Sequence, residues 1–133
     1  MRILIVDDDR PTRLCLSKML GPLGEVAAVG SGQEALDVFG DALTKGSPFE
    51  LICLDIIMPG LDGQATLQAM RDLEARHGVA PGKETKVMMV TCCGDAGNVC
   101  RAFFKGQADG YVTKPMRQAE LIKTLSQMGF TIE

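Results

Sequence analysis

Five short runs of apolar residues, each about as long as a β-strand, place the strongest limit on the fold of this chain. They cover Ile3–Val6, Val26–Val29, Leu51–Leu54, Val87–Val90 and Tyr111–Val112. None of the runs alternates with polar residues, so neither face of such a strand is suited to water. Continuous runs of this kind are typical of parallel strands that helices cover on both sides. The sequence therefore predicts a buried parallel sheet.

Segments with the apolar spacing of helices lie between these runs. Ser31 and Glu34 have the spacing of a capping box, in which Glu34 reaches back to the helix start, and the apolar stripe that follows extends to Leu43. Further helices are expected over Pro11–Leu20, from Asp62 to about His77, over Ala96–Lys105 and over Arg117–Met128. The alternation of five strands with five helices predicts an α/β fold with a doubly wound, five-stranded parallel sheet.

The length and charge of the chain narrow its class further. With 133 residues and no linker or repeat, we expect one domain over residues 1–133, without an attached effector domain. A formal net charge of −3 disfavours nonspecific binding to nucleic acid or to an anionic membrane. The first apolar run has only four residues before three aspartates, which fits neither a signal peptide nor a membrane span. A cytoplasmic protein is therefore expected.

Cysteine usage points to the same compartment. The five cysteines are irregularly spaced, form no CxxC pair and are accompanied by a single histidine, His77. That pattern supports neither a disulfide framework nor a zinc site. We expect thiols inside apolar runs to pack as small hydrophobic groups in a reducing compartment. Nothing around the adjacent pair Cys92-Cys93 favours a redox role.

Ionisable and hydroxyl groups stand where four of the five apolar runs end. Asp7 and Asp8 follow the first run, and Asp55 follows the third. Thr91 comes after the fourth run, and Lys114 lies shortly beyond the fifth. Parallel strands bring their carboxyl ends to one edge of the sheet, which is where open α/β sheets bind ligands. We therefore expect these residues from separate strands to form one site.

The acidic members of this set narrow its chemistry. Carboxylates of Asp7, Asp8 and Asp55 crowded at one edge would repel one another, and one lysine cannot balance all of them. A hard divalent cation with oxygen ligands would balance them, and Mg²⁺, with Mn²⁺ as a substitute, suits carboxylates together with a phosphate oxygen. An aspartate can also act as a nucleophile and form an acyl phosphate. The sequence therefore predicts a metal-assisted site for phosphoryl transfer.

The order of these motifs resembles the receiver domains of two-component response regulators, over essentially the whole chain. The resemblance rests on Asp7-Asp8, Asp55, Met58-Pro59-Gly60, Val90-Thr91 and Lys114-Pro115. Each motif alone is weak, but all of them in this order are specific. The family implies the flavodoxin-like strand order 2-1-3-4-5. It also implies a cis peptide bond before the proline.

The resemblance further implies a role for each acidic residue. Asp55 would accept a phosphoryl group from a histidine kinase or a histidine phosphotransfer protein. Asp8 and Asp55 would bind Mg²⁺ directly, together with the backbone carbonyl of Ile57. Asp7 would act on the metal mostly through water. Such a domain is a phosphoacceptor rather than an enzyme, with at most self-phosphorylation and self-dephosphorylation.

Three further residues are implied in the response to phosphorylation. Thr91 resembles the hydroxyl that moves onto the phosphoryl oxygen, and Lys114 resembles the cation that pairs with it. Tyr111 resembles the aromatic switch whose ring turns inward when Thr91 shifts. Output would pass through a surface to an unidentified downstream protein. The domain would act as a monomer or a phosphorylation-dependent dimer, without direct contact to nucleic acid or membrane.

The sequence leaves open two other functions and one further metal ligand. Asp7, one spacer and Asp9 match the signature of haloacid-dehalogenase-type phosphohydrolases, although Pro11 stands where that family has a small β-branched or hydroxyl residue. A flavodoxin-like nucleotide-binding module would need a glycine- and hydroxyl-rich loop after the first strand, where this chain is acidic. Asp9 could serve as a further metal ligand, but a role in starting the first helix is favoured.

The phosphorylated form is predicted to be long-lived. Ile57 and Cys93 stand two residues beyond Asp55 and Thr91, at positions where the family controls access of water to the phosphoryl group. Neither side chain can orient water well. After loading with acetyl phosphate, we expect slow release of inorganic phosphate from the purified protein. Rapid self-hydrolysis in that assay would contradict the prediction.

Overall fold

The computed structural model describes residues 1–56, 60, 63–91 and 108–131, and these ranges contain all five predicted strands. The strands are β1 (Arg2–Val6), β2 (Glu25–Val29), β3 (Leu51–Asp55), β4 (Lys86–Thr91) and β5 (Gly110–Thr113). They form one parallel sheet in the order β2-β1-β3-β4-β5. The predicted fold class and strand order are confirmed.

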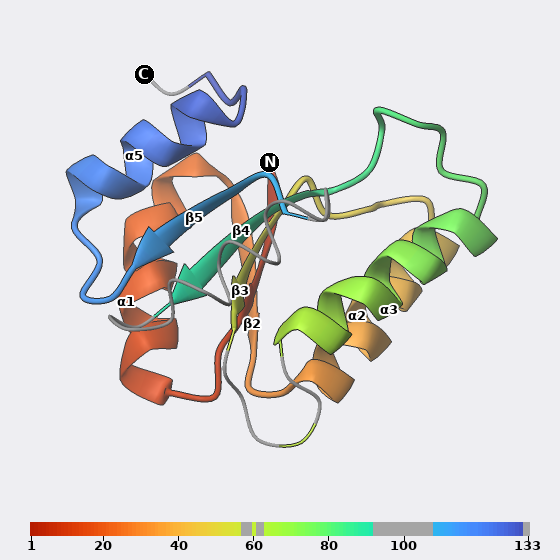
Figure 1. Cartoon of the computed structure of the whole chain (residues 1–133), viewed down its shortest axis with the longest axis horizontal. Helices are drawn as coiled ribbons and strands as arrows, with labels where there is room; N and C mark the ends of the chain where they lie inside the picture. Colours follow the sequence, from red (N-terminus) through yellow and green to blue (C-terminus); the bar gives the residue numbers. More distant parts are fainter. Residues whose placement is uncertain (57–59, 61–62, 92–107, 132–133) are drawn as a thin grey trace.

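Helices cover both faces of the sheet, with α2 and α3 on one side and α1 and α5 on the other (Figure 1). Their bounds are α1 (Arg10–Leu20), α2 (Gly32–Thr44), α3 (Gly63–Arg76) and α5 (Gln118–Gln127), and a short 3₁₀ helix, η1 (Gly21–Leu23), follows α1. The helix predicted over Ala96–Lys105 lies outside the described residues. Within the described ranges, no helix is both long and apolar enough to cross a membrane.

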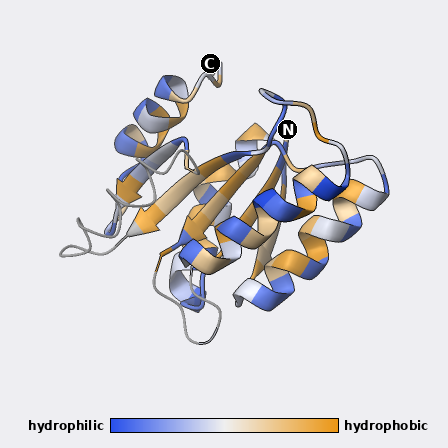
Figure 2. Ribbon diagram, turned by 45° about the vertical axis from the view of Figure 1, so that its right-hand side comes forward, coloured by the Kyte–Doolittle hydropathy of each residue, from blue (hydrophilic) through white to orange (hydrophobic). Residues whose placement is uncertain are grey.

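The core consists of two apolar layers, one on each side of the sheet. The strands of the sheet are largely hydrophobic in colour along the ribbon (Figure 2). Leu4 and Ile52 belong to the layer beneath α2 and α3. Ile3, Ile5 and Cys53 belong to the layer beneath α1 and α5. Both faces of β1 and β3 are therefore covered, which explains why these strands carry no polar alternation. Polar side chains of the central strands are confined to the strand ends.

Local side-chain contacts fix where α2 begins. Ser31 caps the helix by accepting a hydrogen bond from the Glu34 backbone N–H at 3.2 Å. The Glu34 carboxylate lies 3.5 Å from the Ser31 hydroxyl, rather than on the Ser31 backbone N–H that the capping-box pattern predicted. The cap is thus confirmed, and Glu34 reaches back to the helix start as predicted, although its carboxylate meets the Ser31 hydroxyl. Asp62, the predicted start of this third helix, lies outside the described residues, and α3 begins at Gly63.

A buried polar network holds the loop between α3 and β4. The network lies at the edge of the sheet where β4 and β5 begin. Glu74 is 2% exposed, and its carboxylate accepts from Arg71 Nη1 at 2.8 Å and from the Thr85 backbone N–H at 2.7 Å. Arg71 also donates to the Thr85 carbonyl at 2.8 Å and lies 3.6 Å from Asp109. Each buried carboxylate oxygen of Glu74 thus has a donor, which removes the penalty of burying it. No pattern in the sequence predicted this network.

Cys53 and Cys15 should differ sharply in reactivity. Cys53 is fully buried in β3, and desolvation raises the pKa of its thiol to about 12, whereas Cys15 is exposed on α1. Because the thiolate is the reactive species, we expect native Cys53 to be alkylated roughly a thousandfold more slowly than Cys15. Peptide mass spectrometry after a short pulse of iodoacetamide at mildly alkaline pH measures the ratio. In concentrated urea the two rates should converge, and equal labelling of the native protein would refute the assignment.

Candidate functional site

Three carboxylates meet at the carboxyl edge of the sheet. Asp55 is the last residue of β3, and Asp7 directly follows β1, whose Val6 is in register with Leu54 of β3. One oxygen each of Asp7, Asp8 and Asp55 lies within 4.8 Å of the other two. Asp7 and Asp55 are 1% and 4% exposed, whereas Asp8 is exposed. The parallel register is therefore enough to bring together acids that are far apart in the sequence.

Lys114 reaches this acidic cluster from beyond the end of β5. Its Nζ lies 3.1 Å from Asp7 Oδ2 and 3.4 Å from Asp55 Oδ2. The peptide bond between Lys114 and Pro115 is cis, as the family resemblance implies. One ammonium thus lies between two buried carboxylates. Four of the predicted site residues, from three strand ends, are brought together in one place.

Thr91 stands at the same edge, on the neighbouring strand. It ends β4, one residue beyond Val90, which is the register partner of Asp55. The backbone therefore places Thr91 at the level of the acidic cluster. Ile57, with its predicted carbonyl ligand, and Cys93, with its predicted influence on water, lie outside the described residues.

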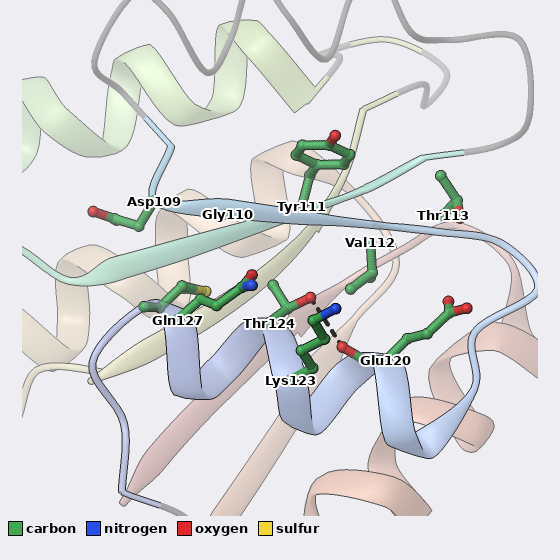
Figure 3. A pocket seen from close by; sticks show the side chains of 10 residues that line it. Asp109, Gly110, Tyr111, Val112, Thr113, Glu120, Lys123, Thr124 and Gln127 are labelled. Atoms are coloured by element: carbon green, nitrogen blue, oxygen red, sulfur yellow. Dashed lines mark hydrogen bonds between the residues drawn. The ribbon is translucent and has the colours of Figure 1, made fainter.

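Tyr111 lies on β5 with its side chain 49% exposed. Figure 3 shows its ring on one face of the strand and Val112 on the other, toward α5. A groove between β5 and α5 is lined by residues of both elements and includes Gly110 and Met128. Gly110 permits this close approach of α5, because a Cβ there would lie 2.8 Å from the Met128 sulfur. The ring of Tyr111 thus lies at the surface, on the strand that leads to Lys114.

The turn between β1 and α1 is held by its own polar groups. The Asp9 N–H donates to Asp7 Oδ1 at 2.8 Å, and the Thr12 N–H donates to Asp9 Oδ2 at 3.1 Å. Hydrogen bonds from Thr12, first from its hydroxyl and then from its backbone, lower the pKa of Asp9. Asp9 therefore caps α1, and the predicted role in starting this helix is confirmed.

Two residues to which the sequence analysis gave no role also shape the site. Arg13 on α1 donates from Nη1 to the backbone carbonyl of Asp7 at 2.7 Å. Gly63 begins α3 so close to β3 that a Cβ there would lie 2.1 Å from the carbonyl oxygen of Asp55. Both contacts act on the backbone of an acidic residue. Neither leaves a periodic signal in the sequence, because each depends on how two elements approach in space.

The donor set fits a hard divalent cation such as Mg²⁺. Its ligands are carboxylate oxygens, and among the described residues three carboxylates face the Lys114 ammonium, which leaves an excess of negative charge in this part of the chain. Asp7 Oδ2 is buried and accepts no hydrogen bond within the described residues, although the Lys114 ammonium is near. The spread of 4.8 Å slightly exceeds the roughly 4.2 Å across an Mg²⁺ octahedron. Direct ligation by some carboxylates and water-mediated ligation by others suits that spread.

Comparison with known families gives a match over almost the entire chain. The family model of the response regulator receiver domain matches residues 3–126. Among curated proteins, the sensor histidine kinase GacS of Pseudomonas protegens is 32% identical over 127 residues. That alignment covers 93% of this chain and 13% of the kinase, so the chain spans about an eighth of that relative's length.

Solved structures agree with this match. The receiver domain of the histidine kinase CKI1 from Arabidopsis thaliana, complexed with Mg²⁺ and BeF₃⁻, is 28% identical with a TM-score of 0.81. The alignment covers 96% of this chain and 88% of that domain. The chemotaxis protein CheY4 of Vibrio cholerae is 26% identical with a TM-score of 0.75, over 96% of this chain and 97% of that protein.

These matches bear on the alternatives that the sequence left open. The match to the family model of the receiver domain spans residues 3–126 and thus includes the acidic residues, Thr91 and Lys114. It supports neither the phosphohydrolase nor the nucleotide-binding interpretation. The fold, the strand order and the acidic edge of the sheet agree with it. The chain belongs to the response regulator receiver domain family of two-component systems.

Proposed function

We propose that residues 1–133 form one receiver domain that accepts a phosphoryl group on Asp55 and acts as a switch in two-component signal transduction. The observation that carries this proposal is the contact of a single ammonium, Lys114, with two buried carboxylates, Asp7 and Asp55. Such a cluster combines a carboxylate nucleophile with the cations that a phosphoryl group requires. Membership of the receiver family supports the same function.

Asp55 is the best placed of the three acids to be the nucleophile. It ends β3, the middle strand of the sheet, with β1 on one side and β4 on the other. A phosphoryl group on Asp55 is therefore flanked by groups from both neighbours and reached by Lys114 from β5.

The phosphoryl donor is a phosphohistidine of a histidine kinase or a histidine phosphotransfer protein. A carboxylate oxygen of Asp55 attacks phosphorus, the new P–O bond forms as the P–N bond breaks, and the departing imidazole nitrogen takes up a proton. Lys114 pairs with the charge on the phosphoryl oxygens. When bound, Mg²⁺ supplies further positive charge to these oxygens, held by Asp8 and Asp55 directly and by Asp7 through water. Acetyl phosphate reacts in the same way, with acetate as the leaving group.

Phosphorylation is read out through β5. Lys114 directly follows this strand, and Thr91 of β4 is in register with Thr113 of β5. A shift of Lys114 and Thr91 toward the phosphoryl oxygens therefore acts on the strand that carries Tyr111. The result is a change in the populations of two surface conformations rather than a new fold. A downstream protein that binds one of the two conformations better receives the signal.

Asp55→Asn should abolish phosphorylation, because an amide is not a nucleophile for phosphorus. We expect acetyl phosphate and Mg²⁺ to add one hydroxylamine-labile phosphoryl group to the wild type, on the peptide that bears residue 55. The Asn variant should load at least about a hundredfold less by intact-mass spectrometry. Asp37→Asn, which removes an exposed carboxylate on α2, should load like the wild type. A retained adduct in Asp55→Asn, together with its loss in Asp7→Asn, would instead support the phosphohydrolase.

Magnesium should stabilise the fold through Asp8. A ligand that binds only the folded state adds about 2.7 kcal/mol to the free energy of unfolding at a hundredfold excess over its Kd. The free energy of unfolding of the wild type, measured with urea once in chelator and once in Mg²⁺ at that excess, should differ by this amount between the two conditions. Asp8→Asn should fold but lose most of the difference, because its side chain is an exposed member of the acidic cluster. Asp37→Asn should keep it, and an undiminished effect of Mg²⁺ on Asp8→Asn would refute the assignment.

A further inference from the structure

We propose that Arg13 is a positioning residue of this site, whose guanidinium fixes the peptide that joins Asp7 to Asp8. The inference rests on the proposed function, since it concerns the geometry of the same acidic cluster. Arg13 does not act as a ligand or a nucleophile in this proposal. It acts through the backbone of two residues whose carboxylates belong to the cluster.

The contact between Arg13 and the turn is short and directed. Its Nη1 donates to the Asp7 carbonyl oxygen at 2.7 Å, from a partly buried side chain on α1. Hydrogen bonds from an ionised donor are shorter and stronger than those between neutral groups. Gly30, just beyond β2, leaves room for the guanidinium, because a Cβ at that position would lie 3.1 Å from Arg13 Nη1. A side chain on α1 and a glycine after β2 thus form one fitted contact.

This contact matters because of where it falls on the chain. The Asp7 N–H bonds to the Val29 carbonyl at 3.2 Å, and beyond this bond the chain leaves the sheet for α1. The peptide between Asp7 and Asp8 is planar, so holding its oxygen also sets the direction of the Asp8 N–H and the position of the Asp8 Cα. The guanidinium therefore fixes one carboxylate relative to the next. Groups that orient metal ligands typically change metal affinity by about 10–100-fold when they are removed.

Charge alone predicts the opposite effect. A guanidinium near the acidic cluster repels a divalent cation, so its removal should tighten Mg²⁺ binding if Coulomb interactions dominate. If Arg13 orients the carboxylates, its removal should weaken Mg²⁺ binding in spite of the lost repulsion. The sign of the change in Kd therefore separates the two effects. Arg10, an exposed residue at the start of the same helix, offers a control that removes an equal charge.

The experiment is a titration of the metal-free protein with Mg²⁺. Arg13→Gln has a side chain too short to reach the Asp7 carbonyl, and we expect its Kd for Mg²⁺ to rise about tenfold. Arg13→Lys keeps the positive charge and an N–H donor group and should recover part of this loss. Arg10→Gln should bind Mg²⁺ at least as tightly as the wild type. Binding by Arg13→Gln that equals or exceeds that of the wild type would overturn the proposal.

A second variant and a metal-free measurement guard against a loss of folding. Gly30→Ala keeps Arg13 and pushes its guanidinium by a few tenths of an ångström, so it should weaken Mg²⁺ binding less than Arg13→Gln. In the absence of metal, the NMR resonance of the Asp7 carbonyl carbon should move upfield in Arg13→Gln, as expected for a carbonyl that loses a donor. An unmoved resonance would overturn the proposal. Phosphorylation of Asp55 in the wild type does not depend on that result, so the two proposals fail separately.

Discussion

A single ammonium shared between two buried carboxylates is the interaction on which the site depends. Asp7 and Asp55 are 1% and 4% exposed, and a carboxylate at that depth is costly unless it is paired. Lys114 supplies one positive charge at 3.1 and 3.4 Å, while Asp8 adds a third negative charge beside them. Among the residues that the structure describes, the negative charge of the three acids is thus only partly compensated. The remaining demand for positive charge is what suits the site to a divalent cation and a phosphoryl group.

Buried charges are compensated differently at the two edges of the sheet, one where the strands begin and one where they end. At the edge where β4 begins, Glu74 is held by Arg71 and the Thr85 N–H, and Asp109 lies near both Arg71 and Lys86. Each carboxylate oxygen of Glu74 there has a hydrogen-bond donor. At the opposite edge, within the described ranges, the three acids outnumber the two cations Lys114 and Arg13, and Asp7 Oδ2 accepts no hydrogen bond. The first network ties elements together, whereas the second is left open to an added ion.

Much of this arrangement follows from simple patterns in the sequence. Apolar runs without polar alternation predicted β1 and β3, and the rule that parallel strands share a carboxyl edge predicted the meeting of Asp7 with Asp55. The contacts of Arg13 and Glu74 could not be predicted in this way, because a long side chain can reach several backbone groups and only the packing of elements selects one. The position of the Glu34 carboxylate differs from the capping-box pattern for a similar reason. The cap requires the Ser31 hydroxyl oxygen as the acceptor for the Glu34 N–H, whereas the exposed Glu34 carboxylate can accept from any of several nearby donors.

The two cations beside the acidic cluster differ in kind, and the difference matches their proposed tasks. Arg13 presents a planar guanidinium to a backbone carbonyl, where a fixed direction is what matters. Lys114 presents a compact charge on a flexible stem, so small rotations can exchange a carboxylate oxygen for a phosphoryl oxygen. A guanidinium in the place of that ammonium would hold the carboxylates in one arrangement and resist the exchange. The site therefore combines a rigid part, set by β1 and α1, with an adjustable part at the end of β5. In the proposed function the second part follows the phosphoryl group, and the structural response then travels along β5, while the turn that holds Asp7 and Asp8 keeps its geometry.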